Sequence, residues 1–237
     1  MPRKPVPPQD RLIVALDLPD HAQARDLVER LGETVTFYKI GLELFMAGDY
    51  FALIDWLTAQ GKKVFADLKF YDIPMTVERA VRALSCTPVT FATVHGDPAI
   101  MAAAARGKGA KLKILAVTVL TSLDEAALKA MGYASDLETL VRRRARQAVD
   151  AGLDGVIASG REAQLLRREL GNDPLIVTPG VRPQGSPAGD QKRVVTVEEA
   201  FANGADYIVV GRPIRDAHDP KAAAAAIQRQ IAERFQN

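Results

Sequence analysis

The stretch VFADLKFYDIP, residues 64–74, places an acid, a base and a second acid directly after an apolar run. Asp67 and Lys69 are two residues apart, so in a β-strand their side chains project to the same face. Carboxylates on both sides hold a lysine in its ammonium form, whereas a lysine that forms a Schiff base needs a lowered pKa. The spacing therefore favours Lys69 as a proton donor and fixed positive charge, placed between Asp67 and Asp72.

Short apolar, β-branched segments alternate along the chain with longer segments of helical periodicity. The expected strands are 11–18, 34–41, 62–69, 88–95, 112–120, 154–159, 175–180 and 206–211. The expected helices are 20–31, 43–60, 74–85, 97–105, 136–151, 161–170, 196–203 and 219–235. Near-continuously apolar strands that alternate with helices indicate a parallel sheet covered by helices. The first strand is followed by no Gly-rich turn, so at 237 residues the α/β pattern favours a (β/α)8 TIM barrel over an open doubly wound sheet.

The bulk properties argue against nucleic-acid and membrane partners. A formal net charge of +2 is too small to indicate a nucleic-acid surface, and the arginines of 141–147 follow a helical pattern typical of a solvated face. No apolar run approaches the roughly 18 residues that a membrane span needs. Cys86 is the one cysteine of the sequence, which leaves neither an intrachain disulfide nor a cysteine-based metal site.

The domain organisation expected from the sequence is simple. Residues 1–10 are basic and rich in proline, so we expect a flexible N-terminal tail, and 11–237 contains no linker-like segment, so we expect one barrel catalytic domain. No apolar segment of the kind found in a signal peptide follows the tail. We therefore expect a cytoplasmic protein.

Four ionisable side chains are expected at the carboxyl ends of the first three strands, where TIM barrels carry their active sites. Asp17 and Lys39 end the first two strands, and Asp67 and Lys69 end the third. Neighbouring strands are about 5 Å apart, so inward-facing side chains would form one cluster of alternating charge. A structural ion-pair network at the barrel mouth is the alternative interpretation. His95 ends the fourth strand but has no evident acidic partner, and we interpret it as packing.

A second polar region follows the last two strands. The segment 178–196 is a long Gly- and Pro-rich loop, and loops of this length without structure of their own are often binding loops. The loops after the seventh and eighth strands of TIM barrels frequently bind phosphate. The candidate anion ligands are Arg182, Gln191, the Gly211 N–H and Arg212. An ordinary surface loop with exposed arginines is the alternative, just as Asp72 alone could serve as a helix cap.

Eight segments of the sequence resemble those of bacterial orotidine 5′-phosphate decarboxylases, in the same order, between about residues 11 and 220. They are ALDLP, FYKIGLELF, FADLKFYDIPMTV, LAVTVLTS, GLDGVIAS, TPGVRP, GDQKRV and IVVGRPI. The resemblance implies a homodimeric TIM barrel that converts orotidine 5′-phosphate to uridine 5′-phosphate and CO2 in de novo pyrimidine biosynthesis. It also implies that the reaction uses no metal and no organic cofactor.

The resemblance assigns a role to each candidate site residue. It implies that Lys69 donates a proton to C6, that Asp67 lies beside the substrate carboxylate with Lys39 completing the charge chain, and that Asp72 reaches into the partner subunit's site. It implies that Asp17 and Lys39 contact the ribose and that Thr121, with Ser122 beside it, faces the pyrimidine. Thr76 is a further implied substrate contact. The implied phosphate ligands are Arg182, Gln191, Gly211 and Arg212. Tyr71, where the family usually has histidine, and Met75, where it has a small polar residue, depart from the pattern.

Two other functions remain open from the sequence. A Mg-dependent sugar-phosphate decarboxylase or synthase on a related barrel shares the D-x-K-x-x-D spacing, although Lys39 is a poor neighbour for a metal ion. A non-catalytic barrel that binds a nucleotide phosphate is the other candidate. A protein that only binds has no need to bury alternating charges at the desolvation cost that this entails.

Overall fold

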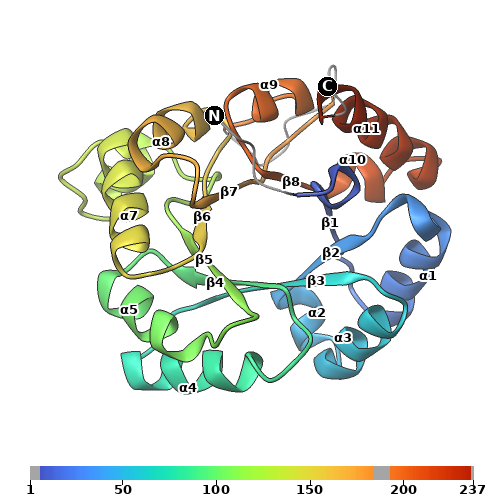
Figure 1. Cartoon of the computed structure of the whole chain (residues 1–237), viewed down its shortest axis with the longest axis horizontal. Coiled ribbons are helices and arrows are strands. Elements are labelled where there is room, and N and C mark those ends of the chain that lie inside the picture. The colour runs from blue at the N-terminus through green and yellow to red at the C-terminus, as the bar shows by residue number, and fades with distance from the viewer. Residues whose placement is uncertain (1–5, 184–192, 236–237) are drawn as a thin grey trace.

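The computed structural model describes residues 6–183 and 193–235, and in them eight parallel strands close into a barrel in the order β1 to β8 (Figure 1). The strands are β1 (Leu12–Ala15), β2 (Phe37–Gly41), β3 (Lys63–Phe70), β4 (Phe91–His95), β5 (Lys113–Val117), β6 (Gly155–Ile157), β7 (Leu175–Thr178) and β8 (Tyr207–Val210). The predicted (β/α)8 barrel is confirmed.

Helices form a ring outside the strands (Figure 1). They are α1 (His21–Leu31), α2 (Leu42–Met46), α3 (Tyr50–Ala59), α4 (Pro74–Leu84), α5 (Pro98–Gly107), α6 (Glu125–Ala130), α7 (Leu137–Asp150), α8 (Ala163–Leu170), α9 (Val197–Ala202), α10 (Arg212–Arg215) and α11 (Pro220–Phe235). Several begin at an aspartate whose carboxylate accepts a first-turn N–H, as Asp20 does from Gln23. None of the helices in the described part of the chain has the length and apolar character that crossing a membrane requires.

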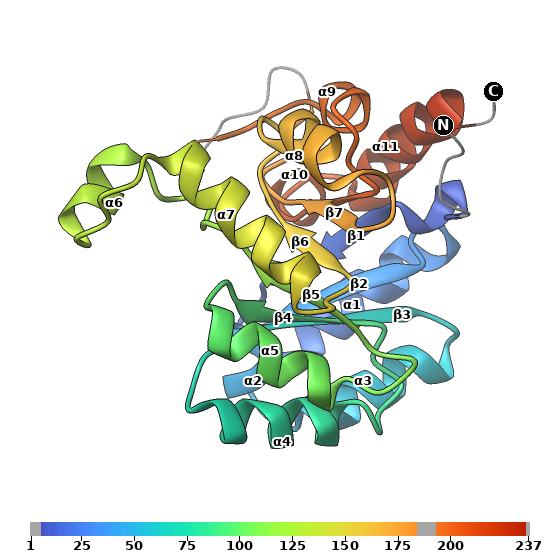
Figure 2. The same cartoon turned by 60° about the vertical axis from the view of Figure 1, so that its left-hand side comes forward.

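The structure differs from the expected elements in three places. The single helix expected over 43–60 is two helices, because Asp49 caps a new start and accepts the Ala52 N–H at 3.1 Å. Helices α6 and α10 were not predicted; α6 lies on an excursion that stands out from the barrel after β5 (Figure 2). Within the expected tail, Pro8–Asp10 forms a 3-10 turn, and the buried Asp10 carboxylate contacts Lys63 Nζ at 2.6 Å. Residues 8–10 of the expected tail are therefore in contact with the barrel.

Side chains fill the barrel interior toward the amino ends of the strands. Phe37, Phe65, Phe91 and Tyr207 pack together there, with Phe91 centroids 5.1 Å from those of both Phe37 and Tyr207. Alternate residues of β3 follow the expected pattern, because Phe65 faces this interior cluster whereas Val64 and Ala66 belong to the layer between strands and helices. This aromatic layer closes the barrel at the amino ends of the strands, so a ligand site is confined to the mouth at their carboxyl ends.

Candidate active site

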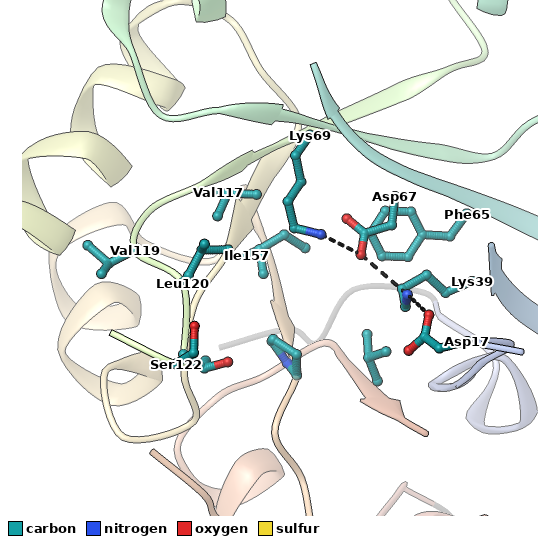
Figure 3. Close-up of a pocket in the computed structure, with 13 residues that line it drawn as sticks. Asp17, Lys39, Phe65, Asp67, Lys69, Val117, Val119, Leu120, Ser122 and Ile157 are labelled. Atoms are coloured by element: carbon teal, nitrogen blue, oxygen red, sulfur yellow. Dashed lines mark hydrogen bonds and ion pairs between the residues drawn. The ribbon is translucent and has the colours of Figure 1, made fainter. Parts of the chain in front are cut away.

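Four charged side chains, from β2, β3 and the segment directly after β1, form a continuous chain at the barrel mouth (Figure 3). Lys39 Nζ lies 2.7 Å from Asp17 Oδ1 and 3.4 Å from Asp67 Oδ2. Lys69 Nζ lies 2.9 Å from the same Asp67 Oδ2. The alternating order Asp17, Lys39, Asp67, Lys69 is the cluster predicted from the sequence.

The register between β2 and β3 makes this arrangement possible. Gly41 is the strand partner of Asp67, and it has no side chain to fill the space above the barrel. A Cβ atom at Gly41 would lie 3.3 Å from Lys39 Nζ and 3.7 Å from Asp17 Oδ1. Gly41 thus leaves the room in which the Lys39 ammonium meets its two carboxylates.

Burial and ion pairing shift the pKa values of Asp67 and Lys39 in opposite directions. Burial alone would raise the pKa of Asp67, but the ammonium groups of Lys39 and Lys69 outweigh it, and the pKa of Asp67 lies below its ordinary value. Burial alone would lower the pKa of Lys39, and the carboxylates of Asp67 and Asp17 outweigh it in the same way, so the pKa of Lys39 is raised. Asp67 is therefore an anion and Lys39 a cation throughout the neutral pH range.

The charge chain lines a cavity, and mostly apolar residues lie across the cavity from Asp17 and Lys39; they are Val117, Val119, Leu120, Ser122 and Ile157 (Figure 3). The lining is completed by Phe65, Thr121, Pro179 and Val209. Thr121 and Ser122 therefore lie at the cavity, as expected. An apolar wall with a few hydroxyl groups, facing a row of charges, suits a flat ring that carries charged substituents.

A second cavity continues from the first, because Asp17, Lys39, Pro179 and Val209 line both. It is also lined by Gly180, Arg182, Gly211, Arg212 and Arg215. Three of the four predicted anion ligands thus lie together, and Gln191 falls outside the described residues. Arg215 was not predicted; its Nη1 donates to the Asp17 main-chain carbonyl, which ties the arginine end of the groove to the charge chain. This end is suited to an anion.

Asp72 and Thr76 do not join the cavity of their own chain. Both are exposed, and Asp72 Oδ1 accepts the N–H of the adjacent Ile73 at 2.6 Å. Helix α4 has Ile73 at its N-cap position and no side-chain capping hydrogen bond, so the capping alternative for Asp72 is not supported. His95 also lies outside the lining of the cavity, and its ring packs against Tyr71 with centroids 4.5 Å apart.

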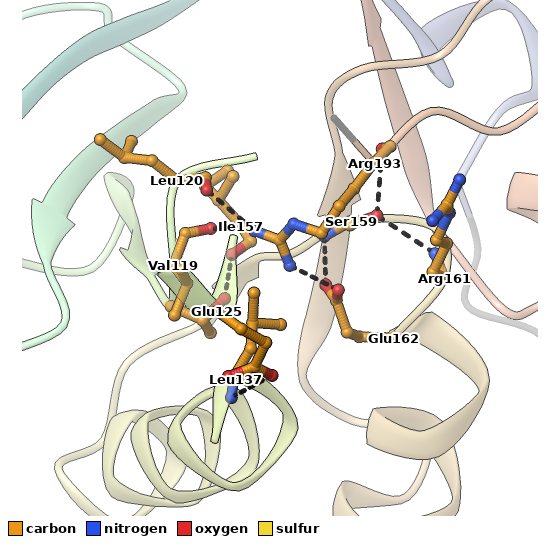
Figure 4. A network of polar contacts seen from close by, with 10 residues as sticks. Val119, Leu120, Glu125, Leu137, Ile157, Ser159, Arg161, Glu162 and Arg193 are labelled. Carbon is orange, nitrogen blue, oxygen red and sulfur yellow. Dashed lines mark hydrogen bonds and ion pairs between the residues drawn. The ribbon is translucent and has the colours of Figure 1, made fainter. Parts of the chain in front are cut away.

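Arg193 belongs to the segment 178–196, which was expected to be a binding loop. Its side chain is buried in a separate network of polar contacts (Figure 4). Its Nη1 contacts Glu162 Oε1 at 2.5 Å, and its Nη2 donates to the carbonyls of Val119 and Leu120 at 3.0 and 2.9 Å. The other oxygen of Glu162 accepts the Ser159 N–H at 2.8 Å. The ion pair therefore joins the loops after β5, β6 and β7, and two of the residues that it holds line the cavity.

We predict that Glu162→Ala destabilises the fold by about 3–5 kcal/mol, because it leaves the Arg193 guanidinium buried without its carboxylate. Asp26→Ala is the matched control: it breaks the Asp26–Arg30 pair, whose side chains are 68% and 51% exposed, and exposed pairs contribute at most about 1 kcal/mol. Urea unfolding of both variants measures the difference. Equal losses in the two variants would show that the buried pair has no special weight.

The donor groups at the barrel mouth do not suit a metal ion. In residues 6–183 and 193–235 no group of three or more His, Cys, Asp or Glu side chains is placed to hold one. The two carboxylates of the charge chain, Asp17 and Asp67, are separated by the Lys39 ammonium, which contacts both. A divalent cation between them would have to displace that ammonium.

Comparisons with known proteins agree with the geometry. Residues 10–227 match the family model described as "Orotidine 5'-phosphate decarboxylase / HUMPS family". The chain is 62% identical to the orotidine 5′-phosphate decarboxylase of Methylococcus capsulatus, over 98% of this chain and 96% of the relative, and 52% identical to that of Stenotrophomonas maltophilia, over 98% of each. The crystal structure of orotidine 5′-phosphate decarboxylase from Lactobacillus acidophilus superposes with a TM-score of 0.83 at 37% identity, covering 94% of this chain and 99% of that one. The chain therefore belongs to the orotidine 5′-phosphate decarboxylase / HUMPS family.

Proposed function

We propose that this protein decarboxylates orotidine 5′-phosphate to uridine 5′-phosphate and CO2, a step of pyrimidine biosynthesis. The observation that carries the proposal is the ammonium of Lys69, held 2.9 Å from the Asp67 carboxylate at the edge of a cavity that continues to three arginines. Relatives that are 62% and 52% identical over nearly the whole chain bear the name of this enzyme. The combination fits a substrate with a carboxylate at one end and a phosphate at the other.

The chemistry requires stabilisation of negative charge at one carbon. When the bond from C6 to the carboxylate breaks, CO2 leaves and the electron pair stays on C6, where the pyrimidine ring offers little delocalisation. A fixed cation beside C6 stabilises this charge electrostatically. Lys69 supplies that cation and then transfers one of its protons to C6, which completes uridine 5′-phosphate and leaves a neutral amine to be reprotonated by water.

Asp67 serves two purposes in this mechanism. Its carboxylate forms an ion pair with Lys69 and directs the ammonium into the cavity. It also lies where the substrate carboxylate would approach, and two like charges repel each other until CO2, which carries no charge, is released. The Lys39 ammonium also contacts the Asp67 carboxylate, so the negative charge of Asp67 is compensated when no substrate is bound.

The shape of the groove places the rest of the substrate. Asp17 and Lys39 line both cavities, which is the position of a ribose that joins a ring to a phosphate. We therefore assign the ribose hydroxyls to Asp17 and Lys39, the pyrimidine edge to Thr121 and Ser122, and the phosphate to Arg182, Arg212 and the Gly211 N–H, with Gln191 as the fourth ligand. The phosphate contacts are remote from the reacting bond and supply binding energy that orients it.

The proposed enzyme is a homodimer. Large apolar side chains are exposed after β2 and β3, two neighbouring strands; they are Leu42, Phe45, Met46, Phe51, Tyr71, Ile73 and Met75. Exposed apolar surface of this extent is typical of a protein–protein interface. Asp72 and Thr76 are also exposed, and in the sequence they flank Ile73 and Met75 of this set. A second copy that covers this surface would receive Asp72 at its own charge chain, which accounts for a carboxylate that contacts no charged group of its own cavity.

The test is a direct assay of the purified protein. Consumption of orotidine 5′-phosphate, followed by the loss of pyrimidine absorbance and by CO2 release, is expected at full rate in the presence of EDTA. The same assay separates the second candidate, a Mg-dependent sugar-phosphate enzyme of the HUMPS branch, whose activity EDTA would abolish. Binding of uridine 5′-phosphate without any turnover of orotidine 5′-phosphate would instead support a non-catalytic barrel.

A further inference from the structure

The backbone of Lys69 has an unusual conformation. Its φ is +48°, and it is the one non-glycine residue with a positive φ in the described ranges. The left-handed region is unfavourable for an ordinary residue, so such a residue persists where its surroundings hold it. At Lys69 this conformation decides where the ammonium points.

An irregularity between β3 and β4 produces this conformation. Ala66 pairs with Ala92 and Phe70 pairs with Val94, so the three residues between them on β3 face a single residue, Thr93, on β4. The extra residues of such a bulge lose their regular strand partners and re-aim a side chain. The bulge therefore explains how β3 presents both Asp67 and Lys69 to the cavity, and it makes Thr93 the residue opposite both.

Thr93 makes two hydrogen bonds, one to each member of the pair. Its Oγ1 accepts the Lys69 main-chain N–H at 3.0 Å and donates to Asp67 Oδ1 at 2.8 Å. Because a hydroxyl has one hydrogen, and an ionised carboxylate can only accept, the direction of both bonds is fixed. The Lys69 and Lys39 ammonium groups both contact the other oxygen, Oδ2. The two oxygens of Asp67 are thus satisfied from opposite sides.

Thr93 is also fully buried, with an exposed fraction of 0%. It does not line either cavity at the barrel mouth, so it is placed behind the pair and not beside a ligand. We infer that Thr93 is a positioning residue for the decarboxylation, which fixes the left-handed backbone of Lys69 and the rotation of the Asp67 carboxylate together. This inference rests on the proposed function, because it names the residue that sets the geometry of the proposed proton donor.

The experiment compares Thr93→Val, which keeps the shape and removes the hydroxyl, with Thr93→Ser, which keeps the hydroxyl. We expect Thr93→Val to lower kcat for orotidine 5′-phosphate by about 100-fold, since small displacements of a reacting group have effects of this order. Thr93→Ser should recover kcat to within a few-fold of the wild type. The Kd for uridine 5′-phosphate should change little in either variant, because the product-binding residues are untouched.

Thr118→Val is the matched control. Thr118 is equally buried, lies after β5, and its hydroxyl donates to the Ile157 carbonyl at 2.9 Å, so the substitution removes a buried hydrogen bond away from the pair. It should lower thermal stability without a comparable loss of kcat. If Thr93→Val lowers kcat no more than Thr118→Val does, Thr93 only supports the fold and the inference is wrong.

A readout independent of turnover separates this inference from the proposed function. The charged groups that contact Asp67 are Lys39 from β2 and Lys69 from β3, with Asp17 beyond Lys39. Tyr50 from α3 interacts with Asp67 electrostatically, and none of these residues is altered in the variants. Loss of the Thr93 hydroxyl should raise the pKa of Asp67, observed by carbon NMR of its carboxyl, and the serine variant should restore it. An unchanged pKa would overturn the inference even if the protein does not decarboxylate orotidine 5′-phosphate. If Thr93→Val does not fold, Thr93→Cys, with its weaker donor and acceptor, replaces it.

Discussion

Lys69→Ala is expected to lower kcat/KM for orotidine 5′-phosphate by at least about 10⁴-fold, because it removes both the proton donor and the nearest fixed positive charge. The fold should remain intact. The Lys69 side chain is 35% exposed at the cavity, and its contact with Asp67 is one of two ion pairs of that carboxylate. Lys39 therefore continues to balance the Asp67 charge in the variant.

The control is a lysine on another strand of the barrel that lies away from the proposed active site. Lys113 is exposed at the first position of β5, at the opposite end of the barrel from the charge chain. Lys113→Ala should retain wild-type kcat/KM, and circular dichroism and thermal melts should show that both variants fold. Turnover of Lys69→Ala within 10-fold of the wild type would exclude Lys69 as the proton donor.

The sequence was sufficient for those features that depend on short-range pattern. The two-residue spacing predicted that Asp67 and Lys69 face the same cavity, which in the structure is brought about by the bulge in β3, and the repeated strand–helix pattern predicted the barrel that brings Asp17 and Lys39 beside them. In a closed parallel barrel the strand ends converge by geometry, so a residue's position in its strand is enough to place it. No contact between distant residues had to be known.

Features that depend on tertiary register could not be predicted in this way. Thr93 has the appearance of an ordinary β-branched residue in the segment FATVH, and only the irregular pairing of β3 with β4 puts it behind the Asp67–Lys69 pair. Arg193 falls in the segment 178–196, which was expected to be a binding loop, and its burial could not be predicted because its carboxylate partner Glu162 is 31 residues away in the sequence. The one available signal for Thr93 was a hydroxyl between the apolar residues Ala92 and Val94.

Short helices were missed for a related reason. Helix α6 has six residues and α10 has four, which is too few turns to show a helical period in the sequence. Helix α10 nevertheless matters for the groove, because it carries Arg212 and Arg215 at the anion end. The predicted anion ligand Arg212 therefore lines the second cavity, and Arg215, one helical turn later, lines it without having been predicted.

Mixing two inactive variants tests whether Asp72 acts across the dimer. In a Lys69→Ala and Asp72→Asn hybrid, the site that retains Lys69 lies on the Asp72→Asn chain and receives an intact Asp72 from the other chain. Random exchange of equal amounts makes half of the dimers hybrid, each with one complete site of two, so about a quarter of the wild-type activity should return. Measuring activity against time after mixing, with the hybrid fraction followed by native mass spectrometry, checks this value.

The control for this experiment is a double variant that carries both substitutions, mixed with the Asp72→Asn chain. In that hybrid no site has both Lys69 and Asp72, whichever chain supplies them, so no activity should return. The two mixtures differ only in whether the donated residue 72 is an aspartate. If Asp72 instead served the cavity of its own chain, the first hybrid would also lack a complete site, and exchange would restore nothing. Asp72 is exposed, and in the described part of its own chain its carboxylate is hydrogen-bonded only to the N–H of Ile73. This is the structural reason to expect that about a quarter of the wild-type activity returns in the first mixture.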